Sequence, residues 1–147
     1  MQTKKKEKWP ERYRGLYAPV PFAVLDSVAF QGASYPARAL LFEIMRQQNG
    51  RNNGHMQLAA SWLATRNWKS CDVIHRAKSE LIGRRLIVET RKGGLSIGPS
   101  QFAVTWLPIT NFQGLDIQRN EYLPGAWDAR PLSKQGGQSV RRNDPIR

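Results

Sequence analysis

The sequence is short of cysteine and histidine. Cys71 is the single cysteine among 147 residues, so no disulfide can form within the chain, which is typical of proteins that fold in a reducing compartment. Cys71 and His75 have the spacing of two metal ligands on one helical face, but a structural zinc site takes four ligands and only His55 remains. We therefore expect no metal and no other cofactor, and we expect Cys71 to be a partly buried residue of a helical first turn.

Long apolar runs are also missing. No stretch approaches the roughly 20 apolar residues that are needed to cross a bilayer. The basic N-terminal stretch MQTKKKEKWPERYRG is not followed by the apolar segment of a secretory signal. These absences predict a cytoplasmic protein without a membrane partner.

Acidic residues are few, and the charge balance is strongly basic. Lys and Arg total 23 against 11 Asp and Glu, which gives a net charge of +12 and a pI near 10.6. An excess of this size concerns partners, of which nucleic acid and anionic membrane surfaces are the usual ones. The sequence also lacks paired carboxylates, a phosphate-binding P-loop, and a third group to orient Cys71 and His75 as nucleophile and base. We predict a binding protein and not an enzyme.

Composition divides the chain into three zones. Residues 1–19 are charged and contain Pro and Gly, which predicts a flexible, disordered basic arm. Residues 20–110 hold nearly all of the periodic apolar pattern. Residues 111–147 are rich in Gly, Pro, Gln, Asn and Arg, which predicts an irregular extension that ends in a disordered basic tail.

Apolar periodicity predicts the helices of the middle zone. Residues recur at three- and four-residue steps in SYPARALLFEIMRQQNG, after the N-cap Ser34, and again in Ile74, Ala77 and Leu81, after the N-cap Ser70. A short helix at AASWLATRN is predicted between them. In PFAVLDSVAFQGAS, an aspartate or the serine after it is predicted to cap one brief helical turn.

Alternating patterns predict the strands. HMQL is long enough for one short strand, and RLIVETR and QFAVTWLPI flank the Gly-rich turn KGGLSIGPS. Phe102, Val104 and Trp106 are predicted to face one way, and the tryptophans at 62, 68 and 106 are predicted to lie in the core or at its edge. Helix, strand, helix, turn, helix, strand, loop and strand is the order of a winged helix-turn-helix. We therefore predict an α+β, mostly helical, single winged helix-turn-helix domain.

Three stretches carry a family resemblance. ARALLFEIMRQQNGRNNGHMQL, SCDVIHRAKSELIGRRLIVETRKGG and FAVTWLPI resemble small winged-helix proteins of phages, plasmids and integrated mobile elements, some of which are similar to the DNA-binding domains of replication initiators. The resemblance covers residues 22–110 and implies double-stranded DNA binding without enzymatic activity. One position departs from the pattern, because Arg85 stands where such domains often have glycine before the first wing strand. The departure predicts an earlier helix end or a different wing angle.

The predicted third helix has a polar face that suits the major groove. Arg76 is the best candidate to recognise guanine, because its guanidinium can pair with O6 and N7 together. His75 and Ser79 are candidates for contacts to bases or phosphates, and Asp72 either accepts from cytosine or only caps the helix. The remaining candidate DNA-binding residues are the phosphate clamps and the flexible wing positions: Arg66, Lys69, Ser70, Arg91, Lys92, Gly93 and Gly94.

Double-stranded DNA binding is therefore the leading function, by a transcriptional regulator or a replication-initiation factor of a mobile element. Replication or transcription proteins are further candidate partners, and the expected location is the nucleoid of the cytoplasm. Two alternatives stay open: an RNA-binding module, which the basic arm and tail allow, and a protein-interaction adaptor built on a winged helix. The residues do not indicate the oligomeric state.

Overall fold

The computed structural model describes residue 15 and residues 17–128 and shows an α+β fold. The predicted fold class is confirmed at this level, and the predicted arm and tail lie largely outside the described residues. Within the described part, none of the helices has both the length and the apolarity that crossing a bilayer requires. The main elements are α1 (Phe22–Leu25), α2 (Val28–Gln31), α3 (Tyr35–Arg46), β1 (Met56–Gln57), α4 (Ala60–Thr65), α5 (Cys71–Gly83), β2 (Ile87–Arg91) and β3 (Gln101–Val104).

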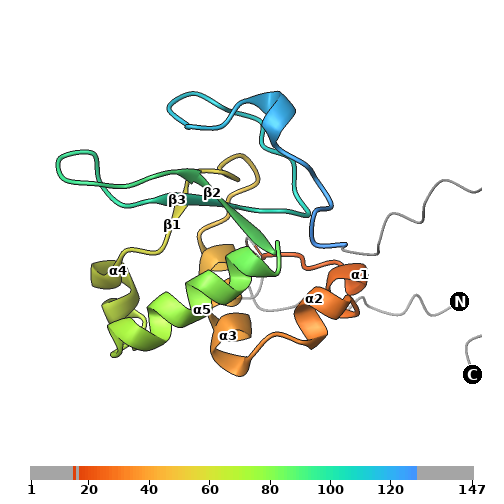
Figure 1. The fold of residues 1–147 in the computed structure, drawn as a ribbon, viewed down its shortest axis with the longest axis horizontal. Coiled ribbons are helices and arrows are strands. Elements are labelled where there is room, and N and C mark those ends of the chain that lie inside the picture. The colour runs from red at the N-terminus through yellow and green to blue at the C-terminus, as the bar shows by residue number, and fades with distance from the viewer. Residues whose placement is uncertain (1–14, 16, 129–147) are drawn as a thin grey trace, which may run out of the picture.

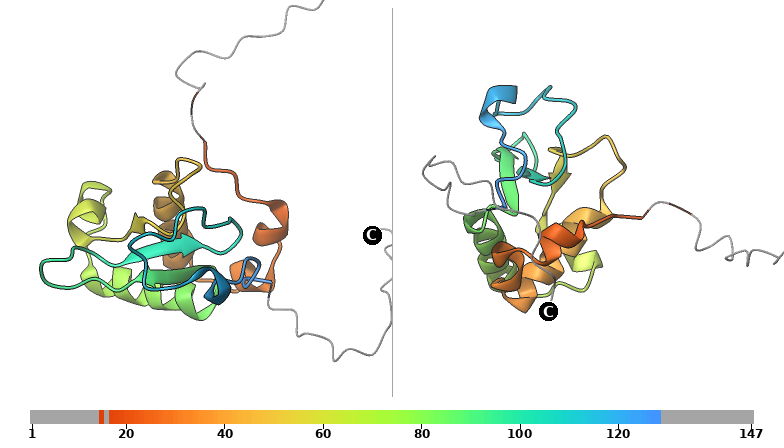
Figure 2. Two further views of the ribbon diagram at one scale, coloured as in Figure 1. Left: turned by 90° about the horizontal axis from the view of Figure 1, so that it is seen from above. Right: turned by 90° about the vertical axis from the view of Figure 1, so that its right-hand side faces the viewer.

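The elements form layers around a small sheet. The helices lie on one side of the sheet and the segment 111–128 lies on the other, as the two perpendicular views in Figures 1 and 2 show. The sheet is antiparallel with strand order β1-β3-β2, so β3 is the central strand. Met56 pairs with Phe102, and Ile87 pairs with Val104. The predicted strands are thus present, although β3 ends at Val104 and Trp106 lies beyond it.

The two long helices form as their sequences predict. The hydroxyl of Ser34 accepts a hydrogen bond from the Ala37 amide at the start of α3, and that of Ser70 accepts one from the Val73 amide at the start of α5. The apolar stripes of both helices are buried in a single core. Because the caps and the stripes depend only on residues within one or two turns, they are local properties of the sequence.

The N-terminal segment contains two short helices and not the single turn that its sequence predicts. Asp26 ends α1, and the Ser27 hydroxyl then accepts a hydrogen bond from the Phe30 amide at the start of α2. Asp26 and Ser27, which the sequence offers as alternative caps, therefore act at consecutive helix ends. The buried side chains of Val24 and Phe30 join both helices to the main core.

Helix α5 ends in a Schellman motif that contains an arginine in a left-handed conformation. The Leu86 amide donates to the Leu81 carbonyl at 3.1 Å, and the Arg85 amide donates to the Ile82 carbonyl at 3.0 Å. Arg85 has φ 59°, where a Cβ is unfavourable and glycine is the usual residue. The helix continues through Gly83, so the expectation that it ends early is wrong, and Arg85 adopts the conformation that glycine normally supplies.

The neighbouring Arg84 has a structural role. Its guanidinium donates to the carbonyls of Ala29 and Gly32 near the end of α2 and forms an ion pair with Glu80. These contacts join the end of α5 to α2.

We therefore expect substitutions at the adjacent residues Arg84 and Arg85 to have opposite effects on stability. Arg85→Gly should raise the free energy of unfolding by up to about 1 kcal/mol because it removes the left-handed strain. Arg84→Ala should lower it by about 1 kcal/mol, because the carbonyls of the buried Ala29 and the exposed Gly32 both lose their donor. Urea unfolding measures both, and a loss on Arg85→Gly would contradict the strain argument.

Glu80 joins the two long helices. Its carboxylate accepts hydrogen bonds from the Ser34 amide at 2.9 Å and the Ser34 hydroxyl at 2.5 Å. The pKa of Glu80 is lowered below its ordinary value of 4.5, chiefly by these two hydrogen bonds and to a smaller extent by Arg84.

We expect this link to make stability depend on pH. Because the pKa of Glu80 is lowered in the folded state, its contribution is complete above about pH 4.5 and is lost as the pH falls through the folded-state value. The free-energy difference between the wild type and Glu80→Gln should therefore be constant near neutral pH and should shrink under acid. Urea unfolding across this range measures it. A difference that is the same at pH 3 and pH 7 would contradict the assignment.

The sheet is covered on both faces. Phe102 and Val104 face the helices, as predicted, and Trp106 packs against the same core from beyond the strand. Ala103 on the opposite face is also fully buried, because Tyr122 and Ile109 pack over it. Apolar residues of the extension 111–128 complete this second cluster. Trp62 and Trp68 lie at the edge of the main core, which confirms the prediction for the tryptophans.

Asp116 and Tyr122 form polar contacts that hold the extension on the sheet. The Asp116 amide donates to the Thr90 carbonyl at 2.8 Å, and the Asp116 carboxylate accepts from the Lys92 amide at 2.7 Å, so Asp116 occupies the open edge of β2. The Tyr122 hydroxyl donates to the Val104 and Leu107 carbonyls. Burial raises the pKa of Tyr122 to about 12, so the phenol keeps its proton at neutral pH.

Candidate nucleic-acid interface

Helix α5 exposes a polar face opposite its buried stripe. Asp72, His75, Arg76 and Ser79 are all exposed, while the buried residues of the same helix face the core. The Arg76 guanidinium forms an ion pair with the Asp72 carboxylate at 2.8 Å, and both side chains are more than two-thirds exposed (71% and 75%). An exposed pair of this kind is worth about 0.2–1 kcal/mol, so Arg76 can leave Asp72 at little cost.

The turn between α4 and α5 is fixed by its own packing. Asn67 has a left-handed φ of 69°, and Trp68 packs against the core. Arg66 forms an ion pair with Glu43 on α3 at 2.8 Å and lies over the Trp62 ring. Arg66 thus holds α4 against α3 and is already neutralised. Lys69 is exposed and forms no ion pair with the described residues, which leaves it available to a phosphate.

Ser70 has a defined local role at the start of α5. Its hydroxyl oxygen accepts a hydrogen bond from the Val73 amide, and its hydroxyl proton stays available to an external acceptor such as a phosphate oxygen. The cap also orients the first turn of the helix, in which the amides of an α-helix lack internal partners. A phosphate contact from Ser70 would therefore use a residue whose position is set by the helix itself.

Strands β2 and β3 continue into a projecting hairpin. Gly94 and Gly98 pair across it, and its left-handed positions are Ser96 (φ 70°) and Gly98 (φ 86°). The expectation that Gly93 and Gly94 supply the turn is therefore wrong in its detail. The Gly93 amide donates to the Ser100 hydroxyl, which brings the two arms of the hairpin close together. Glycine is needed at position 93 because a Cβ there would lie against the Ser100 amide.

Adjacent glycines should therefore respond differently to alanine. In Gly93→Ala the new Cβ would approach the Gly98 carbonyl oxygen to 2.7 Å, so the two arms of the hairpin must separate. We expect a loss of about 1–3 kcal/mol in stability and loss of amide protection in the hairpin. Gly94→Ala is the matched control, because its Cβ would meet only the Ile97 side chain, at 3.5 Å. Urea unfolding and hydrogen exchange measure both variants, and equal behaviour would contradict the close-approach argument.

The basic residues at the base of the hairpin differ in their freedom. The Arg91 guanidinium donates to the Ile97 carbonyl at 3.2 Å, so it helps to close the hairpin. The Lys92 side chain is exposed, although its backbone amide is held by Asp116. Leu95 and Ile97 are exposed at the hairpin tip, Leu95 almost completely (99%). Sequence reasoning missed these two residues, because it took the whole turn as a flexible connection.

The candidate residues gather at one end of the molecule. The hairpin projects past α4, toward the end where α5 begins, in both the front view and the view from above (Figures 1 and 2). The α4–α5 turn, the first turns of α5 and the hairpin therefore border one surface. Its polar groups come from Lys69, Asp72, His75, Arg76 and Lys92, and no acidic residue lies between positions 93 and 100.

Cys71 and His75 gain no further candidate metal ligand in the described part of the chain. Cys71 is exposed, so the expectation that it is partly buried is wrong. No group of three potential His, Cys, Asp or Glu ligands occurs among residues 15 and 17–128.

The fold and this surface define an α+β protein in which the exposed polar face of α5 lies beside a projecting hairpin. No family model matches the chain, and neither the curated proteins nor the solved structures contain a significant match to it.

Proposed function

We propose that this chain is a winged helix-turn-helix protein that binds double-stranded DNA, as a transcriptional regulator or a replication-initiation factor of a mobile element. In this proposal α4 and α5 are the helix-turn-helix unit, α5 is the recognition helix, and the β2–β3 hairpin is the wing. Binding, and not catalysis, is the proposed activity.

The observation that carries the proposal is the polar face of α5 beside the hairpin. The B-DNA major groove is about 12 Å wide and admits one α-helix. Helix α5 is anchored through its buried stripe, so its exposed face can enter a groove without disturbing the core. Arg76 and His75 are then the side chains that reach base edges, with Arg76 suited to guanine.

Charge supports the same proposal. The protein carries a net charge of +12, and neutralised phosphates release counterions, which favours binding. Lys69 lies in the turn just before α5 and Lys92 just after β2, and both are exposed cations. In contrast, Arg66 and Arg91 already have protein partners, so we assign them a secondary share of the phosphate contacts.

Selection of bound fragments from a random duplex pool tests the proposal. We expect enrichment of one site that contains a guanine, and a binding constant that falls steeply with salt. A palindromic site would favour a dimeric regulator, and an array of direct repeats would favour an initiator. Preference for RNA over duplex DNA of the same sequence would favour the RNA-binding alternative. Absence of binding to either would favour the protein adaptor.

A further inference from the structure

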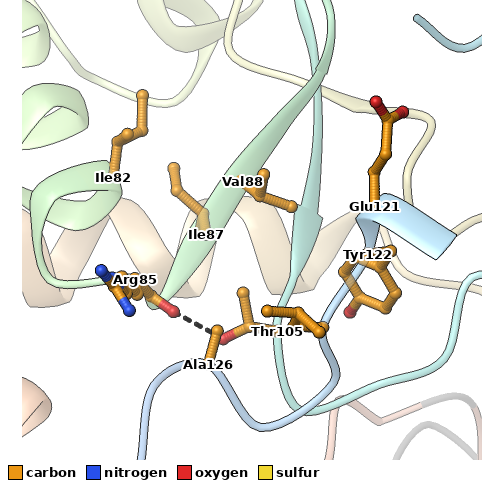
Figure 3. Close-up of a pocket in the computed structure, with 9 residues that line it drawn as sticks. Ile82, Arg85, Ile87, Val88, Thr105, Glu121, Tyr122 and Ala126 are labelled. Carbon is orange, nitrogen blue, oxygen red and sulfur yellow. Dashed lines mark hydrogen bonds between the residues drawn. The ribbon is translucent and has the colours of Figure 1, made fainter. Parts of the chain in front are cut away.

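A cavity of about 330 Å³ lies between the end of α5, strand β2, Thr105 just after β3, and the segment that contains Tyr122. Its size is at the lower end of the range of small-molecule sites, about 300–1,000 Å³. The lining side chains come from elements that are far apart in the sequence and converge on one space (Figure 3). Most of them are apolar: Ile82, Ile87, Val88, Tyr122, Leu123 and Ala126, with Thr105, Arg85 and Glu121 as the polar members.

The polar groups of this cavity are satisfied within the protein, with one exception. The Thr105 hydroxyl donates to the Arg85 carbonyl, and the Tyr122 hydroxyl donates to two backbone carbonyls. The Glu121 carboxylate accepts from the Gln118 amide at 2.6 Å. The Arg85 guanidinium forms no hydrogen bond or ion pair with any described residue. The cavity therefore offers apolar walls and one unused cation.

The position of Arg85 adds a second observation. Its backbone occupies the left-handed position just after the C-cap Arg84 of α5, where glycine would avoid the strain of a Cβ. The exposed Arg85 side chain lies at the outer edge of the lining residues, at the opposite end of the group from Glu121 (Figure 3). An anion is thus attracted to one end of the cavity and disfavoured at the other, which sets the direction in which an amphipathic molecule would lie.

We propose that this cavity binds a small amphipathic carboxylate, with its apolar body against Ile82, Ile87 and Val88 and its carboxylate on the Arg85 guanidinium. Arginine presents two parallel N–H donors that match the two oxygens of a carboxylate. The apolar body replaces water along the wall that α5 and β2 share. The inference does not rest on DNA binding, because none of these four residues belongs to the proposed recognition face.

Octanoate is the probe for the test, and octan-1-ol is its uncharged counterpart. Methyl NMR titration of the full chain should show saturable shifts at Ile82, Ile87, Val88 and Leu123 with octanoate. Arg85→Gly should weaken octanoate binding about tenfold or more and change octanol binding less than about twofold, because only the carboxylate loses a partner. Lys69→Ala is the charge-matched control and should leave both titrations unchanged.

A second variant tests the location independently. Ala126→Phe places an aromatic ring in the cavity and should abolish the octanoate shifts while the remaining spectrum keeps its dispersion. Three results would overturn the proposal: shifts that do not saturate, shifts at methyls away from the cavity, or equal octanoate affinity in the wild type and Arg85→Gly. Because octanoate binding and DNA binding are measured separately, failure of one proposal is distinguishable from failure of the other.

Discussion

Replacement of Arg76 by alanine is expected to lower affinity for the selected duplex by about 1–3 kcal/mol and to relax the preference at one base pair. The guanidinium is exposed on the polar side of α5, and its only ion-pair partner within the described part of the chain is the exposed Asp72. The exposed ion pair is worth about 0.2–1 kcal/mol. A bidentate contact to guanine discriminates against other bases by about 1–3 kcal/mol, so exchange of the ion pair for that contact is favourable. Fluorescence anisotropy on the selected and a scrambled duplex, across a salt series, measures the effect.

Two matched variants separate base recognition from phosphate attraction. Arg76→Lys keeps the charge but loses the planar pair of donors, so it should lose sequence preference and retain the salt dependence. Lys69→Ala should weaken binding to both duplexes equally and reduce the salt slope by about one unit. If Arg76→Ala behaves like Lys69→Ala on both duplexes, Arg76 is only a phosphate contact and its assignment to guanine fails.

Replacement of Asn53 by aspartate is expected to destabilise the fold by about 4 kcal/mol or more. Asn53 is buried, and its amide nitrogen lies 3.1 Å from the Val104 carbonyl oxygen, 2.9 Å from that of Leu107 and 3.3 Å from that of Pro108. Its amide oxygen accepts from the Val104 amide at 2.9 Å. The side chain thus takes the place of a strand residue beyond the short β1. One oxygen of the introduced carboxylate would keep the Val104 amide, but the other would face three carbonyl oxygens without a donor. A buried charge without a counterion is among the most destabilising changes.

The comparison with alanine and with the neighbouring asparagine sharpens this prediction. Asn53→Ala should cost about 3 kcal/mol, because it leaves the Val104 amide unpaired but introduces no charge. Asn52→Asp is the matched control, since Asn52 is less buried and its amide oxygen accepts from the Asn49 amide. The loss of unfolding free energy in Asn53→Asp, relative to the wild type, should grow as the pH rises above about 4, because burial favours the protonated form of the introduced acid. Equal stability of the two aspartate variants in urea unfolding would contradict the role of Asn53.

The long helices could be predicted because their causes are local. Ser34 and Ser70 each accept an amide only three residues ahead, and the buried stripes repeat within single helices. The basic surface near α5 was also predictable, because its residues are close in sequence. The partners of these arginines were not, since Arg66 meets Glu43 and Arg84 meets α2 only through the packing of separate helices.

The sequence by itself determined the α+β class, the two capped helices, the strands and the basic excess of the chain, because composition, hydrophobic periodicity and capping are set by the residues themselves and their near neighbours in sequence. Only the tertiary structure decided that neither face of β3 is open to water. The alternation of Phe102 and Val104 predicts one buried face, yet Ala103 is also buried, because the extension 111–128 folds back over it. The same packing put Gly93 against Ser100 and left the Arg85 guanidinium beside a cavity. These features depend on contacts between segments that are distant in sequence, and their energies come from close packing and from the burial of polar groups, which no local pattern encodes.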